Sequence, residues 1–291
     1  MAISDLYLAY RLEPASQLPY QSMSYFMSKH LWTSLAKDKV LSGIFRSVYE
    51  AIKQLKNKGI NIVENKYGSW EQIHKNQLPY VFSSLTNVLE ERGLPVSNFL
   101  YAHQVDLPFY NNTKLLNIGV EAPSGKQGYY SALLQGKDFV LLDGQSKTIY
   151  DFNARHVYDF NARHGIHLDN AGQAASYLRF FTDNISGAKG EPFPTVESVT
   201  DLPWSYTVTK EYIVSLHQYI PAMSVAEYED SEGWRIQIGI SHQNNFFTAQ
   251  FLVEKNGVVA MLSNHALTNP LPVGRVSVEN GLWLTDYVCE W

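Results

Sequence analysis

The sequence predicts a mixed α+β fold in which a helical N-terminal region precedes an antiparallel β-sheet domain with packed helices. Apolar residues recur at steps of three and four over residues 41–55, which is the period of an amphipathic helix. From residue 234 the period changes to two, and Asn256-Gly257 separates two apolar runs, which is the strongest short-range signal of a β-hairpin. Helices followed by strands, with few alternating βαβ units, favour α+β over a doubly wound sheet.

Three helices are expected in the first 95 residues, over 25–35, over 41–55 and from Pro79 to Gly93. Ser69 and Gln72 fit a capping box for a further short helix. We place a domain boundary near residue 95. Residues 1–95 then form a mainly helical region and residues 96–291 an α+β domain with an antiparallel meander, although the two could be one continuous domain.

After Pro95 short apolar runs predict strands. They cover residues 100–105, 115–120, 129–134 and 139–142. Asn170 is expected to cap a helix that ends near Gly187, and residues 208–216 predict another helix. The meander follows at 234–240, 247–253 and 258–262. In the helix after Asn170, Tyr177–Phe181 is expected to be core, with Arg179 reaching water or Glu191.

Composition limits the classes of function. The chain has 291 residues, of which 45% are hydrophobic and 13% aromatic, enough for a large core. Its 23 basic and 28 acidic residues give a net charge of −5 without a basic block, which makes nucleic acid an unfavourable partner. Cys289 is the single cysteine, so an intrachain disulfide is impossible. Neither a signal peptide nor an apolar stretch of membrane length is present, and we expect a cytoplasmic protein.

The most conspicuous feature of the chain is a tandem duplication. Residues 149–156 read IYDFNARH and residues 157–164 read VYDFNARH, so only the first position differs. Each copy carries an Asp, an Asn, an Arg and a His. Gly144 is expected to open a loop that leads into this segment.

The duplication has three possible interpretations, of which two are chemical and one is structural. Arg155 and Arg163, with His164 and His167, are the candidate catalytic residues, because paired guanidinium groups bind phosphate or carboxylate. Residues eight apart share one face only in an extended segment. His164, His167 and Asp169 are candidate metal ligands. The alternative is an insertion tolerated because loops absorb extra residues at small entropic cost.

Several segments in the second half of the chain form a recurring pattern. They are Leu141–Gly144, Ala174–Phe181, Glu191–Phe193, Asp201–Trp204, Phe247–Phe251 and Gly257–Met261. On these segments, residues 129–271 resemble an uncharacterised bacterial protein family, a domain of unknown function, and the resemblance implies no activity. That family has one copy of the Asn-containing segment, which leaves open whether Asn153 or Asn161 holds the corresponding place.

Two functions are compatible with the sequence. The first is a cytoplasmic bacterial binding or interaction protein, a regulator or subunit in a defence, toxin–antitoxin or stress system, with a protein partner or self-association. Its abundant Tyr, Trp and Phe residues are typical of interface anchors. The second is an enzyme acting on a phosphorylated or nucleotide substrate through the duplicated segment. Neither a phosphate-binding loop nor a G-x-G-x-x-G pattern occurs, so we expect no cofactor.

Overall fold

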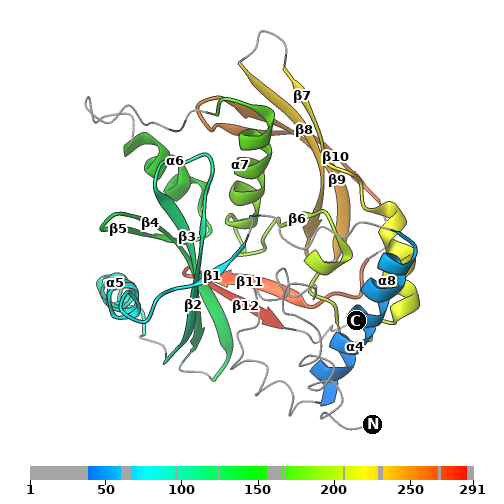
Figure 1. Ribbon diagram of the computed structural model, residues 1–291, viewed down its shortest axis with the longest axis horizontal. Coiled ribbons are helices and arrows are strands. Elements are labelled where there is room, and N and C mark those ends of the chain that lie inside the picture. The colour runs from blue at the N-terminus through cyan, green and yellow to red at the C-terminus, as the bar shows by residue number, and fades with distance from the viewer. Residues whose placement is uncertain are drawn as a thin grey trace.

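The protein is a mixed α+β fold built on two antiparallel sheets. The computed structural model describes residues 39–59, 67, 69–95, 98–122, 125–155, 166, 168–205, 207–228, 232–267 and 270–286. Figure 1 shows the two sheets side by side, with one helix between them and further helices on their outer faces.

The first sheet has seven strands and centres on β4. Its strands are β1 (Glu71–Gln72), β2 (Asn98–Asp106), β3 (Thr113–Glu121), β4 (Gln127–Gln135), β5 (Asp138–Leu142), β11 (Arg275–Glu279) and β12 (Leu282–Asp286). Strand β3 pairs with one edge of β4 along its whole length. The other edge of β4 is divided, because β5 pairs with residues 131–135 and β12 with residues 128–130.

The second sheet has five strands and centres on β8. Its strands are β6 (Thr195–Val196), β7 (Ser224–Glu227), β8 (Gly233–His242), β9 (Asn245–Glu254) and β10 (Val259–Ala266). Strands β6 and β7 divide one edge of β8, and β9 pairs with the other edge. Strand β10 pairs with β9 and ends the sheet.

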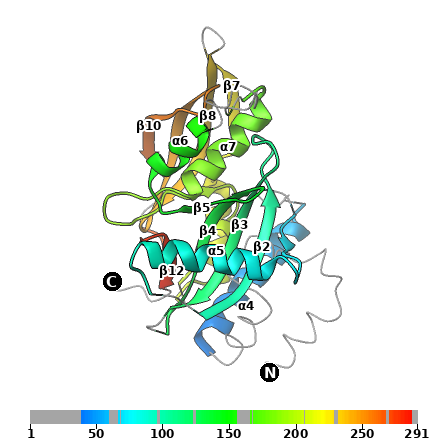
Figure 2. The same ribbon diagram turned by 90° about the vertical axis from the view of Figure 1, so that its left-hand side faces the viewer.

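The helices complete a layered arrangement (Figures 1 and 2). Helix α5 (Leu78–Glu91) covers the outer face of the first sheet, where its buried Val81, Leu85 and Leu89 join the strand residues of one core cluster. Helices α4 (Lys39–Asn57) and α8 (Lys210–Leu216) pack against each other and against the end of the second sheet. Helix α6 (Ser146–Arg155) and helix α7 (Ala171–Asp183) contribute to the core between the two sheets.

Helix α7 is buried over more than half of its circumference. Tyr177, Leu178 and Phe180 are inaccessible to solvent, and Phe181 is 5% exposed. Asn170 begins the helix by accepting a hydrogen bond from the backbone N–H of Gln173. A helix with apolar residues on most sides belongs in a core, so the core assignment of Tyr177–Phe181 is confirmed.

Most of the predicted strands and helices are confirmed. The four strands after residue 95, the meander, the Asn170 cap and the helices α4, α5 and α8 all occur. Residues 25–35, for which we predicted a helix, lie outside the described residues. The division at residue 95 stays a prediction, because residues 1–38 lie outside the described part of the chain as well.

Two predictions on secondary structure are wrong. The capping box at Ser69 and Gln72 does not begin a helix. Residues 71–72 instead form β1, because pairing with β2 places the next residue, Ile73, in the core beneath α5. The helix after Asn170 ends at Asp183 rather than near Gly187, since Ile185 leaves the helix to bridge Gly144.

The C-terminal hairpin β11–β12 was not predicted, although its signal is in the sequence. Asn280-Gly281 separates two apolar runs, and both residues have positive φ, of 52° and 86°. This hairpin closes the first sheet by pairing with β4 at Gly128. A Cβ atom at position 128 would lie 2.4 Å from the backbone oxygen of Trp283, so only glycine permits this approach.

We expect Gly128→Ala to separate the C-terminal hairpin from β4 and to destabilise the protein by about 1–3 kcal/mol, the usual cost of overpacking. Urea unfolding measures the loss. Gly187→Ala is the matched control, because a Cβ atom there would meet its nearest neighbours at 3.6 Å, an ordinary contact distance. Equal stability of the two variants would show that the backbones of β4 and β12 do not approach each other as closely as the structure places them.

Candidate functional site

The first copy of the duplication is helical. Residues 149–155 form most of α6, and because α6 begins at Ser146 the loop expected from Gly144 into the duplication is short. Asp143 supports the start of this helix, where its Oδ1 accepts hydrogen bonds from the backbone N–H of Gln145 and the hydroxyl of Thr148. Ile149 and Phe152 are buried in the core between the sheets, which is the reason that the segment folds as a helix.

Asn153 of the first copy is the centre of a buried hydrogen-bond network. The hydroxyl of Tyr110 donates to Asn153 Oδ1, and Asn153 Nδ2 donates to the hydroxyl oxygen of Tyr177 at 2.9 Å. The hydroxyl of Tyr177 donates in turn to the carbonyl of Gly257 at 2.8 Å. Each hydroxyl therefore has a partner, as buried polar groups require. The network joins the loop after β2, helices α6 and α7 and the turn between β9 and β10.

Burial keeps both tyrosines of the network protonated. Burial and the neighbouring Tyr177 raise the pKa of Tyr110 well above its usual value. Burial also raises the pKa of Tyr177, more than the hydrogen bond from Asn153 lowers it. Neutral hydroxyls that donate to fixed acceptors hold structural elements together. The role of Asn153 in this network is therefore to position α6 against α7.

The side chains of the four predicted catalytic residues lie outside what the structure describes. Arg155 is the last residue of α6, and its side chain is not described. Arg163, His164 and His167 lie outside the described residues. Because the first copy is helical, it does not provide the extended arrangement that a paired arginine site requires. The site itself stays a prediction.

Of the three predicted metal ligands, only Asp169 lies in the described part of the chain. Its side chain is exposed beside the start of α7, and its backbone N–H donates to Gln173 Oε1 at 2.7 Å. Across the described ranges no group of three or more His, Cys, Asp or Glu residues is close enough to hold a metal ion.

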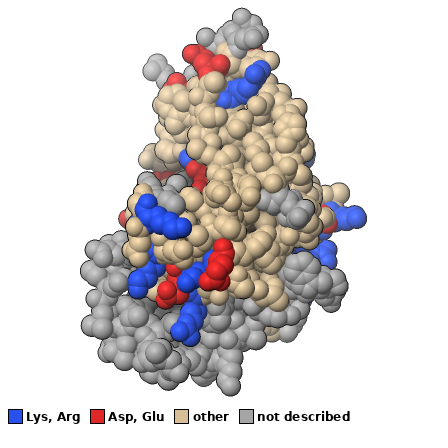
Figure 3. Space-filling model, turned by 90° about the vertical axis from the view of Figure 1, so that its right-hand side faces the viewer, with Lys and Arg blue, Asp and Glu red and all other residues tan. Residues whose placement is uncertain are grey.

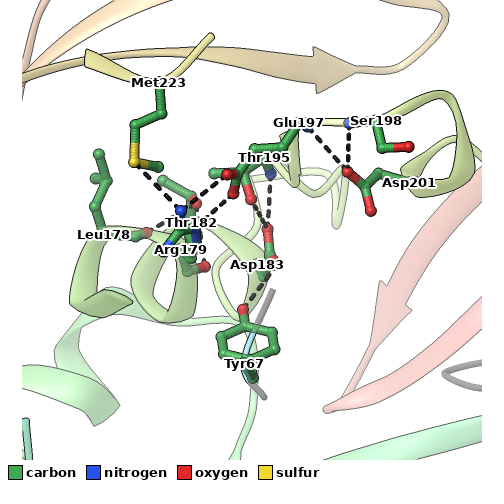
Figure 4. Close-up of polar contacts among 10 residues, drawn as sticks. All are labelled: Tyr67, Leu178, Arg179, Thr182, Asp183, Thr195, Glu197, Ser198, Asp201 and Met223. Carbon is green, nitrogen blue, oxygen red and sulfur yellow. Dashed lines mark hydrogen bonds and ion pairs between the residues drawn. The ribbon is translucent and has the colours of Figure 1, made fainter. Parts of the chain in front are cut away.

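An ion pair that the sequence pattern did not predict fixes α7 to Glu197, the residue directly after β6 (Figure 4). Arg179 Nη2 donates to Glu197 Oε2 at 2.8 Å, and Arg179 Nε donates to the other carboxylate oxygen. The expected partner, Glu191, is therefore wrong. Burial lowers the pKa of Arg179. The hydrogen bonds and the charge of Glu197 raise this pKa, and together with the other nearby negative groups they outweigh the effect of burial, so the net change is upward.

Asp183, at the end of the same helix, makes a second set of contacts (Figure 4). Its Oδ1 accepts from the backbone N–H of Thr195 at 2.7 Å and from the Thr195 hydroxyl at 3.0 Å. Its Oδ2 accepts from the hydroxyl of Tyr67 at 2.7 Å. Both carboxylate oxygens thus have partners inside the protein. Like the ion pair, this cluster attaches β6 to α7.

A polar hollow of about 290 Å³ lies between the end of β5 and the β11–β12 hairpin, the two parts that share one edge of β4. Residues after β5, including Asp143 and Gln145, form one side, and the β11–β12 hairpin contributes Val278 and Asn280. The guanidinium of Arg92 lies 3.7 Å from the carboxylate of Asp143 at this hollow. This surface is large enough for a small molecule and lies beside the start of α6.

Strand β10 is an open edge. It pairs only with β9 among the described strands, and six of its eight residues are exposed. Val258, Met261 and Leu262 are 41%, 44% and 45% exposed, unusually high values for large apolar side chains in a strand region. No charged residue occurs from Val258 to Ala266. Natural edge strands usually carry charges or proline, which prevent pairing with another chain.

The outer face of the second sheet continues this uncharged surface. In the part nearest β10 it carries Gln237, Thr248, Gln250, Leu252, Ala260 and Ser263. Figure 3 shows this side of the molecule as a broad area without charged side chains between a few charges at the top and a mixed cluster below. Arg235 and Glu254 are charged residues of the same face, and the guanidinium of Arg235 lies 5.4 Å from the ring centre of Tyr228.

The comparisons with known proteins give no further guide to function. No family model, no curated protein and no solved structure matches the chain. In the described part of the chain, no helix is long and apolar enough to cross a membrane. The resemblance noted for residues 129–271 therefore carries no argument about activity.

We expect Asn153→Ala to destabilise the protein by about 1–3 kcal/mol, because it removes both hydrogen bonds that Asn153 makes to buried tyrosine hydroxyls. Asn161→Ala is the matched control, since the same residues flank Asn161 in the second copy. Urea unfolding of both variants measures the difference. A larger loss in Asn161→Ala would show that the second copy holds this place in solution.

The raised tyrosine pKa values predict a loss of stability at alkaline pH. In the unfolded chain Tyr110 and Tyr177 ionise near pH 10, whereas in the folded chain burial keeps them protonated. The folded state then binds more protons, so stability is full below pH 10 and falls above it, by about 1.4 kcal/mol per pH unit for each proton. In Tyr110→Phe/Tyr177→Phe we expect urea midpoints that fall less steeply between pH 9 and 11.

The control for this experiment is Tyr80→Phe/Tyr219→Phe, which alters two exposed tyrosines. This control is expected to retain the alkaline slope of the wild type. Identical slopes in both double variants would contradict the assignment of the slope to the buried network.

Proposed function

We propose that this protein is a cytoplasmic, non-enzymatic interaction protein that associates through the open edge strand β10. It is expected to act as a regulator or subunit of a larger bacterial system, as in defence, toxin–antitoxin or stress responses. A helical N-terminal region, residues 1–95, would precede the α+β part that carries this edge. The observation that supports the proposal best is an exposed, uncharged edge strand with Met261 and Leu262 at its middle.

The backbone of β10 supplies the binding groups. In an antiparallel pair every second residue directs its N–H and C=O away from the neighbouring strand. At Val259 the hydroxyl of Tyr150 contacts both groups, at 3.3 and 3.5 Å. The open part of the edge therefore runs from residue 260 to residue 266. An added strand here would gain main-chain hydrogen bonds, and apolar contacts with Met261 and Leu262.

The occupant we propose is β10 of a second copy of this chain. An antiparallel pair of identical strands is self-complementary, because the two-fold axis repeats every N–H···O=C bond from one copy to the other in the opposite direction. Two copies each carry a net charge of −5, yet repulsion beyond about 8 Å is screened at physiological ionic strength. A strand without charges is the part of the surface that two copies can bring into contact without Coulomb cost.

A β-bulge at Leu262 limits how β10 can pair with β10 of a second copy. The register of β10 against β9 shifts between Met261 and Ser263, which increases the local twist of the strand. The Leu262 side chain is thereby exposed near the middle of β10. In a two-fold antiparallel pair, this side chain meets its own copy across the axis. Leu262 is accordingly the position at which a charge would disturb association most.

We expect the wild-type protein to sediment as a dimer and Leu262→Lys to sediment as a monomer at the same concentration, because two lysines would meet at the axis. Tyr219→Lys is the control, since Tyr219 is 50% exposed and lies outside both sheets, in the 3-10 helix after α8. Hydrogen exchange of β10 amides provides a second readout and should slow only in the dimer.

A wild-type protein that remains monomeric at the highest soluble concentration would overturn self-association. A monomer that forms a complex with another protein, lost in Leu262→Lys, would show that a different chain occupies the edge. That result would also overturn the second copy as the occupant.

A further inference from the structure

The polar hollow beside the start of α6 offers space for a ligand that association through β10 does not use. Its volume is about 290 Å³. A water molecule takes up about 30 Å³ in the liquid, so the hollow accommodates roughly ten non-hydrogen atoms. This is the size of a small metabolite and is too small for a nucleotide. The hollow belongs to the first sheet, whereas β10 is an edge of the second.

Four segments form the walls of the hollow, and hydrogen bonds between their backbones hold them together. They are the end of α5 with Arg92 and Leu94, the residues after β5 with Asp143 and Gln145, the loop after α7 with Ser186, Gly187, Ala188 and Gly190, and the β11–β12 hairpin with Val278 and Asn280. The backbone N–H of Ser186 donates to the Gly144 carbonyl, and that of Val278 donates to the Gly190 carbonyl, both at 2.8 Å. The walls are therefore fixed to one another without a ligand, as is usual for a small-molecule site.

Glycine is required at two positions where these walls meet. Gly144 and Gly190 have φ of 83° and 77°, in the left-handed region that favours glycine. A Cβ atom at position 190 would lie 2.5 Å from the backbone oxygen of Val278, and one at position 144 would lie 2.6 Å from Ser186 Oγ. Both glycines thus permit the close approach of the segments that surround the hollow.

Arg92 and Asp143 place opposite charges side by side on the wall of the hollow. Arg92 Nη1 lies 3.7 Å from Asp143 Oδ2, which is beyond the distance of a direct N–H···O hydrogen bond. The other carboxylate oxygen, Asp143 Oδ1, accepts the hydrogen bonds at the start of α6. The two side chains are 38% and 24% exposed, so a ligand in the hollow can reach both of them.

This pair of charges favours a ligand that itself carries both signs of charge. A ligand with several negative charges would meet the repelling carboxylate of Asp143 together with a single arginine. In an α-amino acid, one carbon atom separates the ammonium group from the carboxylate. Its carboxylate would accept from the guanidinium of Arg92, and its ammonium would donate to Asp143 Oδ2, which gives two charge-assisted hydrogen bonds.

The rest of the lining indicates an uncharged polar side chain on the ligand. Gln145 and Asn280 are exposed, and their amides can both donate and accept hydrogen bonds. Besides Arg92 and Asp143, no charged residue from the described part of the chain lines the hollow. A third charge on the ligand would therefore find no counter-charge there.

We propose that the hollow binds a free α-amino acid with a small, uncharged polar side chain, through its carboxylate at Arg92 and its ammonium at Asp143. The proposal is independent of association through β10, because none of the lining residues belongs to the second sheet. A ligand that contacts all four walls binds only the folded chain, so it stabilises the fold by mass action.

The experiment uses L-serine and L-glutamine as probes, with two analogues of serine that each lack one charge. Serinol replaces the carboxylate of serine by a hydroxymethyl group, and L-glycerate replaces its ammonium by a hydroxyl. Nitrogen-15 NMR of the full chain follows the backbone amide signals of Gly187 and Gly190, which line the hollow. We expect one or both amino acids to shift these signals and raise the melting temperature, with a Kd of about 1 mM or tighter. Both analogues should bind at least about tenfold more weakly than serine.

The variants Asp143→Asn and Arg92→Gln test the two charges separately. Asparagine keeps an acceptor oxygen for the Gln145 N–H and the Thr148 hydroxyl, so the start of α6 is retained while the charge facing Arg92 is removed. Each variant should bind the amino acid at least about tenfold more weakly, because one charge-assisted hydrogen bond is lost. Arg46→Gln, at an exposed position of α4, is the control and should bind as the wild type does.

Three results would contradict the proposal. They are no response to either amino acid at about 10 mM, equal affinity for L-glycerate and L-serine, and wild-type affinity in Arg92→Gln. Equal affinity for L-glycerate would show that the hollow binds a simple anion through Arg92. Arg92→Gln alters a partly exposed side chain, so it gives a result even where Asp143→Asn does not fold.

Discussion

The burial of α7 between two sheets is the constraint on which the rest of the structure depends. Tyr177, Leu178 and Phe180 are inaccessible to solvent, so apolar surface from both sheets must meet this helix. Every polar group that α7 carries into the core then needs a partner. The Thr182 hydroxyl donates to the Leu178 carbonyl within the helix. Tyr177 is satisfied by Asn153 and Gly257, which belong to other elements.

This requirement explains how distant parts of the chain are held together. Arg179 and Asp183 lie on the less buried side of α7, where Asp183 binds Thr195 of β6 and Arg179 binds Glu197, the residue after β6. Since β6 pairs with the end of β8, these contacts connect the helix to the second sheet. Replacing one partner of such a pair leaves a charge without compensation, whereas replacing both by apolar groups costs far less. The ion pair therefore specifies position more than it adds stability.

Local patterns predicted the parts of the fold that depend on local interactions. The meander β8–β10 was predicted because period-two apolar runs and Asn256-Gly257 act within a few residues. The helix α7 was predicted from Asn170 and its apolar residues for the same reason. The short strands β1 and β6 were not predicted, because only pairing with distant strands makes two residues a strand.

The contacts that organise the candidate sites were beyond local patterns for the same reason. The hydroxyl of Tyr110 bonds a residue 43 positions away, and that of Tyr177 bonds one 80 positions away. Arg179 was expected to reach water or Glu191, but its partner is Glu197, which β6 brings beside α7. The walls of the polar hollow come from four segments that lie apart in the sequence, which no single run of residues reveals.

The structure changes the interpretation of the duplication, because the first copy forms most of α6 and packs this helix into the core between the sheets. Its buried residues are Ile149, Phe152 and Asn153, and the second copy repeats them as Val157, Phe160 and Asn161. Deleting residues 149–156 or residues 157–164 gives chains that differ by a single methylene group, the difference between Ile and Val. Such a change costs about 0.5–1.5 kcal/mol in a core. Either single-copy chain therefore retains the residues by which α6 packs into the core, and a use of the Asp, Arg and His residues of the second copy stays a prediction.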